Sequence, residues 1–180
     1  CGNSILRAEF PKLLRCCPYC GHHFKMSAQE RMDSVMDNYR LIHDEPPITN
    51  PIKFPQYERK VKQIRKEKGV DEAVMAAVGN ISGCAAVVVA METEFFMASM
   101  GTYVGEQIAK AFEYAGEYKL PVIVFAASGG ARMQEGIYSL MQMAKTALAV
   151  RKHSDLGLLY VSVLTNPTTG GVSASFASLG

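Results

Sequence analysis

The sequence predicts an α/β domain preceded by a small metal-binding module. From residue 73 onward, apolar runs typical of buried strands alternate with amphipathic stretches typical of helices. Four of the five cysteines lie at positions 1, 16, 17 and 20, so the start of the chain has a different character. Gly-Gly pairs follow two of the expected strands, at 129–130 and 170–171, and they direct attention to the backbone as a binding element.

Length and composition narrow the range of functions. The 180 residues are 48% hydrophobic and 20% charged, with a formal net charge of +2, which is typical of one soluble domain with a small extra module. The pI near 8.3 falls short of the basic footprint of a nucleic-acid-binding domain. No apolar run reaches the roughly 18 residues of a membrane-spanning helix, and no secretory leader is visible. We expect a cytoplasmic protein with no membrane partner.

The cysteines of residues 1–24 have the spacing of a zinc ribbon. Cys17 and Cys20 form a C-x-x-C knuckle, and fifteen residues separate Cys1 from Cys17. This interval fits a ribbon in which Cys1 is the second Cys of a first knuckle lost upstream. Cys1, Cys17 and Cys20 are therefore the expected ligands of a structural Zn²⁺, and residues 1–24 are expected to be a partial ribbon.

Several points about this module stay open. An upstream Cys is the favoured fourth ligand, and His22 or His23 is the alternative. Cys16 is out of register with the knuckle and is expected not to bind metal. The competing interpretation is that these are thiols without metal. A disulfide framework does not fit, because the remaining 160 residues carry a single Cys, and we infer a reducing compartment.

Residues 25–72 are expected to form a helical linker or arm. Residues 27–38 look helical because Ser27 and Glu30 make a capping box before an apolar face. Four prolines between positions 46 and 55 indicate an extended connection. Residues 56–69 predict a helix with six Lys or Arg and two Glu, ending at Gly69. A solvated helix face is the favoured interpretation of this charge, and a docking surface for a phosphate-bearing ligand is the alternative.

Residues 73–180 are expected to form the main domain. Two strands, at 73–81 and 84–92, are joined by a turn, and an amphipathic helix then ends near Lys119. Buried strands at 120–127 and 158–164 flank a long helix at 131–154. The chain begins at Cys1 and stops in a Gly/Ser-rich stretch, so we expect it to be a piece of a longer protein, with this domain truncated.

The Gly-Gly pairs are expected to open helices and to bind negative charge. The first N–H groups of a helix have no intrahelical partner and lie at the positive end of its dipole, and Gly lets a ligand approach them. Phosphate binding is disfavoured, because "SGGARMQEG" is not a P-loop and "GTYVG" is not a dinucleotide fingerprint. Stabilisation of an enolate or oxyanion is favoured, with tight strand–helix packing as the alternative.

Other side chains offer few catalytic candidates. Arg132 and Glu135 are expected to form an ordinary helix pair at i and i+3. His43 and His153 have no evident catalytic partner in the sequence, and no general base lies at a recognisable sequence spacing from Ser128. The Met-rich stretch "MQEGIYSLMQM" is expected to be core or a subunit contact.

Several motifs together resemble one enzyme family. "CPYCGHH", "NPIKFP", "MASMGTYVGEQI", "ASGGARMQEGI" and "VLTNPTTGGVSASFASLG" are similar to the β subunit of the bacterial and plastid-type acetyl-CoA carboxylase carboxyltransferase. The resemblance runs, with gaps at 38–80, over essentially the whole chain. It implies a zinc ribbon followed by the first half of a crotonase-like (ClpP/crotonase) domain, in which ββα units stack as a spiral.

The resemblance also implies a reaction and its site. Carboxybiotin on a carrier protein would supply a carboxyl group to acetyl-CoA, giving malonyl-CoA for fatty acid biosynthesis. Gly170 and Gly171 match the backbone oxyanion hole for the thioester enolate. Gly129, Gly130 and Ala131 would line the same pocket and bind substrate. Cys1, Cys17 and Cys20 match the zinc ligands.

The partners that the resemblance implies are the other parts of that enzyme. They are a carboxyltransferase α subunit in a heterotetramer of two α and two β chains, the biotin carboxyl carrier protein, and biotin carboxylase in the wider, ATP-binding complex. The biotin-side oxyanion hole would belong to the α subunit. The location would be the cytoplasm, or the plastid stroma in a plant or alga.

Three alternatives remain. A carboxyltransferase for another acyl-CoA, such as propionyl-CoA, differs only in pocket size. An enoyl-CoA hydratase or isomerase of the same fold needs a Glu base, for which Glu135 is the candidate near a Gly pair. A zinc-ribbon nucleic-acid-binding module is disfavoured, because the ribbon has few basic residues and no aromatic ladder.

Overall fold

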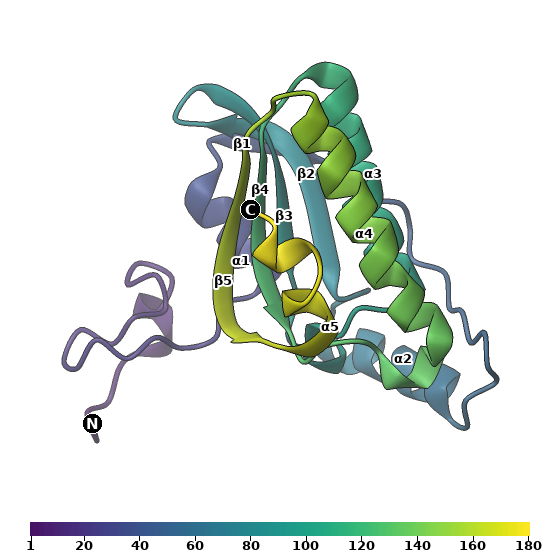
Figure 1. Cartoon of the computed structure of the whole chain (residues 1–180). Helices are drawn as coiled ribbons and strands as arrows, with labels where there is room; N and C mark the ends of the chain where they lie inside the picture. Colours follow the sequence, from purple (N-terminus) through teal and green to yellow (C-terminus); the bar gives the residue numbers. More distant parts are fainter.

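Five strands form a single mixed sheet in this computed structural model, which describes residues 1–180 (Figure 1). The spatial order is β1-β2-β3-β4-β5. The first three strands pair antiparallel, whereas β3 with β4 and β4 with β5 pair parallel. The strands are β1 (Asn38–Leu41), β2 (Val74–Ile81), β3 (Cys84–Met91), β4 (Val122–Ser128) and β5 (Tyr160–Thr168).

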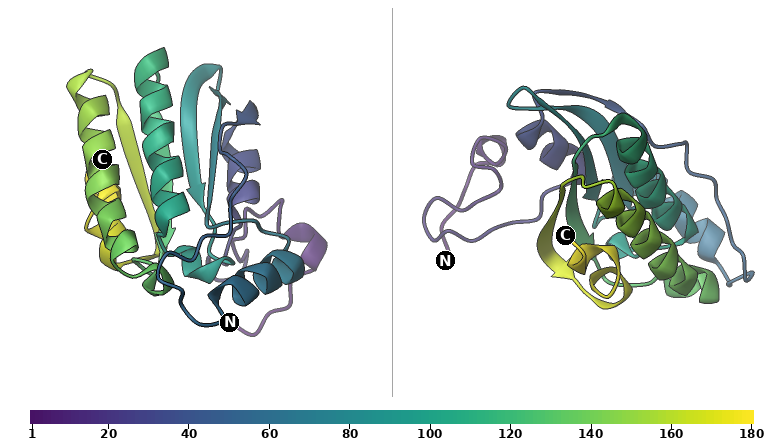
Figure 2. Two further views of the ribbon diagram at one scale, coloured as in Figure 1. Left: turned by 90° about the vertical axis from the view of Figure 1, so that its right-hand side faces the viewer. Right: turned by 45° about the horizontal axis from the view of Figure 1, so that its top comes forward.

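Helices cover both faces of this sheet. The two long helices α3 and α4 pack side by side on one face, and α1 lies on the other (Figures 1 and 2). The helix α2 crosses one end of the sheet, and the Cys-rich N-terminal segment stands apart from the body (Figure 2). The helices are α1 (Ala28–Val35), α2 (Tyr57–Lys68), α3 (Thr102–Tyr118), α4 (Ile137–Asp155) and α5 (Gly170–Ser173), with 3₁₀ turns η1 (Arg7–Glu9), η2 (Phe96–Ala98), η3 (Met133–Glu135) and η4 (Phe176–Ser178).

The expected β2–β3 hairpin is confirmed. Its two-residue turn, Ser82–Gly83, has positive φ at both positions (50° and 80°), the backbone of the tight turns that match strand twist. The strand β3 lies at the centre of the sheet, and six consecutive residues at its carboxyl end are buried. Its side chains contribute to both cores, one under α3 and one under α1.

The expected first helix is confirmed as α1, but it ends at Val35, and Asn38, the last residue of the expected helix, begins β1. The capping box is present: the Ser27 side chain accepts from the Glu30 amide, and the Glu30 carboxylate accepts from the Ser27 amide. A second carboxylate, that of Glu92 after β3, accepts from the amide of Ala28 at 2.8 Å. Acidic groups at a helix N-terminus are favourable because they oppose the dipole. On the apolar face of α1, Met32 is completely buried.

The arm at residues 25–72 contains structure that the sequence pattern does not reveal. The strand β1 pairs with the outer edge of β2, with Asn38 opposite Asn80. Its four residues are mostly exposed and lack an apolar alternation, so no strand was predicted there. The expected basic helix is confirmed as α2, and its residues Tyr57 and Val61 are buried in the main core. None of the helices combines the length and apolar character needed to cross a membrane.

The expectation that both Gly pairs open helices is wrong for the first pair. Helix α4 begins at Ile137, whereas residues 131–136 form a bridge and a 3₁₀ turn. The physical reason is that Ala131 pairs with Met100, and the buried Arg132 keeps an extended backbone (φ −73°, ψ 103°). The second pair does open a helix, α5, but that helix has only four residues.

Candidate functional site at the carboxyl ends of the parallel strands

The two Gly pairs lie against each other. Each pair follows the carboxyl end of a parallel strand, β4 or β5, so both reach the same edge of the sheet, at the bottom of Figure 1. A Cβ on Gly170 would lie 3.2 Å from the Cα of Gly130, and both residues have positive φ (55° and 112°). The Thr169 amide joins the loops by donating to the Ser128 carbonyl at 3.0 Å. Ligands of open α/β sheets bind at this edge.

The amides of the first pair are used within the chain. Gly129 donates to the carbonyl of Met97 at 2.8 Å, and Gly130 donates to Oγ of Ser128 at 2.9 Å. These N–H groups hold the loop in shape. By contrast, Gly170 and Gly171 begin α5, and the first N–H groups of any helix have no acceptor within it.

The structure places Ala131 beside the second pair. A Cβ on Gly171 would lie 3.4 Å from both the Cβ and the amide nitrogen of Ala131. All five glycine-loop residues expected from the sequence, 129–131 and 170–171, are therefore neighbours. Five cavities of about 310 to 480 Å³ lie elsewhere on the chain, and none of these five is lined by a glycine-loop residue.

Ser128 is held in place and has a structural role. Its hydroxyl is completely buried and donates toward the carbonyls of Ala98 at 2.8 Å and Gly130 at 3.2 Å, and it accepts from the Gly130 amide. These contacts tie η2 to the Gly129–Gly130 turn. A hydroxyl with its hydrogen-bonding capacity filled in this way is not poised to act as a nucleophile.

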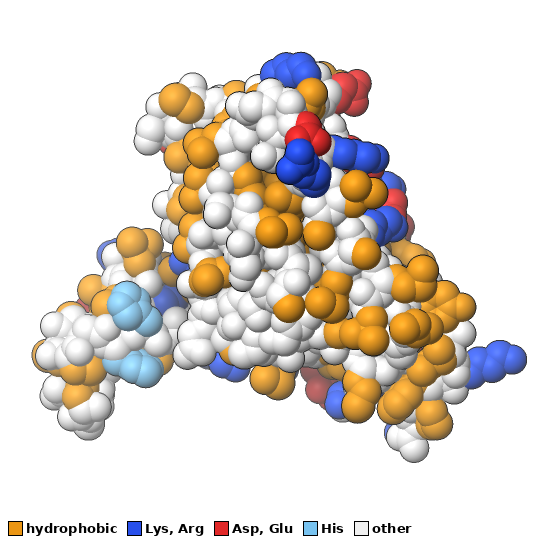
Figure 3. Space-filling model, viewed as in Figure 1, with side chains coloured by type: hydrophobic (Ala, Val, Ile, Leu, Met, Phe, Trp, Pro, Cys, Tyr) orange, Lys and Arg blue, Asp and Glu red, His pale blue; other side chains and the backbone are white.

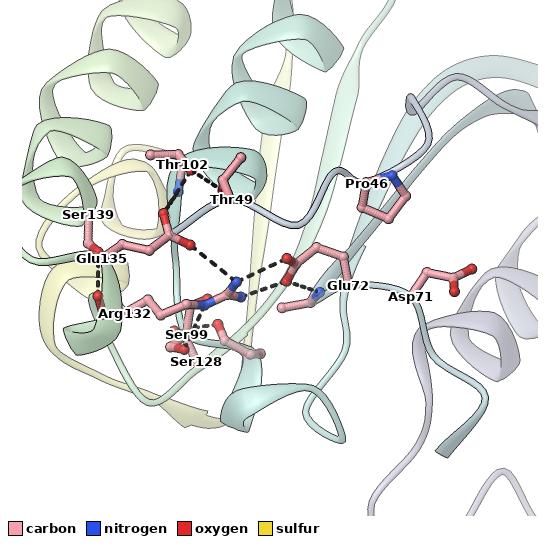
Figure 4. A network of polar contacts seen from close by, with 12 residues as sticks. Pro46, Thr49, Asp71, Glu72, Ser99, Thr102, Ser128, Arg132, Glu135 and Ser139 are labelled. Carbon is pink, nitrogen blue, oxygen red and sulfur yellow. Dashed lines mark hydrogen bonds and ion pairs between the residues drawn. The ribbon is translucent and has the colours of Figure 1, made fainter. Parts of the chain in front are cut away.

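Arg132 is the most deeply buried charge of the chain, with no exposed side-chain surface. Two of its nitrogens reach the Glu72 carboxylate at 2.6 and 3.0 Å, a bidentate ion pair (Figure 4). It also donates to the Ser99 carbonyl at 2.8 Å, and its guanidinium lies 5.2 Å from the centroid of the Phe95 ring. Burial alone lowers the pKa of Arg132, but the charge of Glu72 outweighs this and raises the pKa, so the side chain stays charged.

Glu135 lies next to this pair and is fully engaged. Its carboxylate accepts from the Tyr57 hydroxyl at 2.9 Å. It also accepts from both the amide and the hydroxyl of Thr102 at 2.7 Å, and Figure 4 shows Thr102 beside it. Gly101 is required here, because a Cβ would lie 2.3 Å from Oε1 of Glu135. Burial raises the pKa of the Tyr57 phenol above its ordinary value. A carboxylate so bound is not available as a general base, which removes support from the hydratase alternative.

Glu72, Tyr57 and Ser99 are the residues that sequence reasoning missed. The expected pairing of Arg132 with Glu135 is confirmed, because their charged atoms are 3.6 Å apart. The expectation of an ordinary pair on a helix is wrong, because both side chains are buried and both residues precede α4. Charged residues this deeply buried are almost always paired, but Glu72 is 60 residues from Arg132 in sequence, so no local spacing identifies the partner.

The three expected metal-binding thiols converge. The Sγ atoms of Cys1, Cys17 and Cys20 all lie within 4.8 Å of one another, and those of Cys1 and Cys17 are 3.9 Å apart. Zn–S bonds of about 2.3 Å in a tetrahedron put ligand sulfurs about 3.8 Å apart, so this donor set fits zinc. The amides of Tyr19 and Cys20 lower the pKa of the Cys17 thiol, which favours the thiolate that a metal binds.

The remaining ligand candidates lie outside this cluster. Cys16, His22 and His23 are absent from the group of converging donors, and the Cys16 thiol contacts the Gly21 carbonyl at 3.5 Å. His22 packs edge-on against Phe24. The knuckle itself is closed by the Cys17 amide, which donates to the His22 carbonyl at 2.8 Å.

Solved structures similar to this one define the class of the fold. A Pseudomonas malonate decarboxylase hetero-tetramer in complex with malonate is 25% identical, with a TM-score of 0.62, covering 82% of this chain and 54% of that one. Transcarboxylase 12S with methylmalonyl-coenzyme A and methylmalonic acid bound is 24% identical, with a TM-score of 0.59, covering 72% of this chain and 24% of that one. The mixed α/β architecture fits the expected crotonase-like fold. The chain spans about half the length of the malonate decarboxylase chain it matches.

The family follows from the sequence model that the chain matches. Residues 45–178 match the carboxyl transferase domain. This match covers well over half of the chain, which therefore belongs to the carboxyl transferase domain family.

Proposed function

We propose that this chain transfers a carboxyl group to an acyl-CoA, as the β subunit of an acetyl-CoA carboxylase carboxyltransferase. The observation that carries the proposal is the meeting of two Gly-Gly loops at the carboxyl ends of β4 and β5, in a chain of the carboxyl transferase family. The motifs that resemble the β subunit, above all "NPTTGGVSASFASLG", support acetyl-CoA as the acceptor. The malonate and methylmalonyl-CoA of the similar structures support substrates of the same chemical class.

The residues of this chain act mainly through the backbone. Loss of a methyl proton from acetyl-CoA leaves an enolate whose negative charge lies largely on the thioester oxygen. The N–H groups of Gly170 and Gly171 are proposed to hold that oxygen, and such preorganised donors are typically worth 10²–10³ in rate each. Gly129, Gly130 and Ala131 shape the wall on which the acyl group rests. The carboxyl group comes from carboxybiotin on a carrier protein, and no residue here is assigned to biotin.

The buried ion pair has a supporting role in this proposal. Arg132 is two residues beyond Gly130. Ala131, the residue between them, forms an isolated β-bridge with Met100. By fixing Arg132 to Glu72 and Ser99, the chain fixes the position of the Gly129–Gly130 turn, against which Gly170 packs. Precise placement of donors is what oxyanion stabilisation requires.

The division into parts and the zinc site are proposals of the same kind. Residues 1–24 are proposed to be the zinc-ribbon part, 25–72 the arm, and 73–180 the crotonase-like part. Cys1, Cys17 and Cys20 are proposed to bind Zn²⁺ with one further ligand. The metal would have a structural role, because an all-thiolate site leaves no open position for substrate.

An α subunit is the proposed main partner, within the two-α, two-β assembly that the resemblance implies. Exposed apolar side chains along α4 support a protein contact, and they gather toward the lower right of Figure 3. Ile137, Leu140 and Met141 on α4 are 60%, 51% and 60% exposed, and Met133, in the η3 turn just before α4, is 71% exposed. The carrier protein and biotin carboxylase would meet this assembly, in the cytoplasm or plastid stroma.

Carboxyl transfer can be measured in reverse with free biotin. The full-length protein, purified with its α subunit, is expected to decarboxylate malonyl-CoA in a biotin-dependent reaction, and to prefer malonyl-CoA to methylmalonyl-CoA. A preference for methylmalonyl-CoA would assign the chain to a propionyl-CoA enzyme instead. The proposed function would be refuted if malonyl-CoA were decarboxylated without biotin, or if no decarboxylation were detected.

A further inference from the structure

One ion pair joins the ribbon, residues 1–24, to the body of the protein. The guanidinium of Arg15 donates to Oε1 of Glu30 through both Nε, at 3.0 Å, and Nη2. No other hydrogen bond or ion pair connects the ribbon with the rest of the chain. Beside the pair, a cavity of about 310 Å³ lies between the ribbon and α1, lined on the ribbon side by Pro11 and Leu14. The contact is therefore narrow, and it depends on Arg15.

The backbone of Arg15 has an unfavourable conformation that the interior of the ribbon holds in place. Leu14 and Arg15 both have positive φ (47° and 58°), which a residue with a Cβ adopts only at an energetic cost. The Arg15 amide donates to the Phe10 carbonyl at 3.0 Å, and the Arg15 carbonyl accepts from the Phe24 amide at 2.8 Å. The rings of Phe10 and Phe24 pack edge-on, with centroids 5.0 Å apart. These contacts maintain the left-handed turn from which the Arg15 side chain reaches α1.

This turn is part of the metal-binding module. Cys16, next to Arg15, forms an isolated β-bridge with His23, and the expected zinc ligand Cys17 follows directly. Cys17 is also the only buried residue of the ribbon, which therefore has almost no core of its own. A module this small needs a metal to hold its fold. Without zinc, the left-handed turn should relax, and Arg15 should leave Glu30.

Glu30 connects the ion pair to the start of α1. Its second carboxylate oxygen, Oε2, accepts from the Ser27 amide at 3.0 Å, which completes the capping box. Burial raises the pKa of Glu30, but the hydrogen bonds from Arg15 and Ser27 outweigh this and lower the pKa, so the carboxylate stays charged. The Ala28 amide donates in turn to Glu92, just after β3. The first turn of α1 thus lies between the ribbon and the central strand of the sheet.

We propose that Arg15 couples the metal site to the body of the protein, so that zinc binding fastens the ribbon to α1 and stabilises the first turn of that helix. The inference rests on the zinc site proposed above. Zinc fixes the turn at Leu14 and Arg15, and this turn places the guanidinium on Glu30. Because such coupling is reciprocal, loss of the ion pair must weaken zinc binding by the factor by which zinc strengthens the pair. A ribbon tethered only by flexible chain would show neither effect.

Zinc affinity tests the coupling without depending on activity. The full-length protein is titrated with Zn²⁺ in competition with a chelator of known affinity. Glu30→Gln removes the charge that Arg15 binds, but Gln at this position still completes a capping box, so α1 should keep its start. This variant is expected to raise the Kd for zinc about fivefold. Arg15→Gln should have the same effect, and the double variant should have no larger effect than either single variant.

A matched control removes a carboxylate far from the ribbon. Glu113→Gln changes an exposed residue of α3 and should leave the Kd for zinc within about twofold. An unchanged Kd in Glu30→Gln, equal weakening by Glu113→Gln, or additive effects of the Arg15 and Glu30 variants would overturn the coupling. Each of these results, in a protein that binds zinc, leaves the zinc site and the proposed function standing. Wild-type protein that binds no zinc refutes the zinc site and the coupling together.

Amide hydrogen exchange locates the effect within the fold. The amides of Glu30 and Arg31, bonded to Oγ and the carbonyl of Ser27, report on the first turn of α1. Removal of zinc should accelerate their exchange about fivefold or more, whereas Val88, in the middle of β3, should stay as protected as before. Glu30→Gln should abolish this dependence on zinc. Equal exchange of the α1 amides with and without zinc would overturn the proposal, and so would an acceleration that is the same in α1 and β3.

Discussion

Gly130 and Gly170 pack backbone against backbone, so closely that a Cβ on Gly170 would lie 3.2 Å from the Cα of Gly130. Both need the positive φ that only Gly adopts without strain. The contact makes the loops after β4 and β5 one unit, since neither can move without the other. Packing thus explains Gly130 and Gly170, whereas Gly171, with no positive φ, is the better test of an oxyanion role.

Gly171→Ala should fold and lose activity. The added Cβ would meet the Met143 sulfur at 3.2 Å, and that flexible side chain can move. The crowded peptide can no longer present its N–H at hydrogen-bond distance from the enolate, so kcat should fall by about 10²–10³. Turnover and a thermal melt are measured together. A normal melt with nearly wild-type kcat would show that Gly171 serves packing alone.

Gly170→Ala is expected to damage stability first. A left-handed backbone costs a residue with a Cβ about 1–2 kcal/mol, and the Gly130 backbone cannot retreat easily. A lower urea midpoint than that of Gly171→Ala is the expected result. If both variants have the same midpoint, the close contact between the loops does not exist in solution.

Separating Arg132 from Glu72 should be strongly destabilising. Removal of one partner leaves the other charge buried without compensation, at a cost of about 3–5 kcal/mol. Arg132→Met and Glu72→Gln are each measured by urea unfolding, together with the double variant. The double variant should cost less than the sum of the single variants, because the lone buried charge is then gone. Strict additivity would mean that the two side chains do not interact.

The three converging thiols should bind zinc in the full-length protein. Metal analysis is expected to give one Zn²⁺ per chain, and Cys17→Ser or Cys20→Ser should abolish it. Cys16→Ser is the matched control and should keep the metal, because its thiol lies outside the cluster. Loss of zinc in the Cys16 variant, or retention in the Cys17 variant, would contradict the assigned ligand set.

The exposed face of α4 should be required for assembly. Ile137→Lys with Met141→Lys replaces two side chains that are each 60% exposed, so the chain should fold, but binding of the α subunit should be lost. Size-exclusion chromatography of the mixed subunits measures this. Lys152→Glu, further along α4, is the control. Normal assembly of the Lys variant would place the subunit contact elsewhere.

The stability of the chain should fall in alkali. Burial raises the pKa of Tyr160 to about 12, whereas the phenol of an unfolded chain ionises near pH 10. The folded state thus retains the proton that the unfolded state loses. The contribution of Tyr160 to the free energy of unfolding is complete below about pH 10 and is lost between about pH 10 and 12. The loss amounts to up to about 1.4 kcal/mol per pH unit. Urea midpoints from pH 8 to 11 should show a smaller decline for Tyr160→Phe than for Tyr118→Phe, which alters an exposed ring.

The sequence by itself predicted four of the five strands, the long helices and the cluster of three thiols, because each of these depends on local pattern. The β2–β3 hairpin depends on alternation and a short turn, α1 on a capping box within three residues, and the Cys17–Cys20 knuckle on fixed spacing. The glycine loops were also visible, since Gly after a buried strand marks a close approach of backbone.

Only the tertiary structure decided what those glycines and charges contact. The Gly130–Gly170 contact and the pairing of Arg132 with Glu72 join residues far apart in sequence, and the short strand β1 exists only because the edge of β2 provides hydrogen-bonding partners. Arg132 also delays α4 by six residues, against the local preference for helix. A buried charge must find its counterion wherever the fold offers one, and that requirement outweighs the fraction of a kcal/mol by which local helix propensities differ.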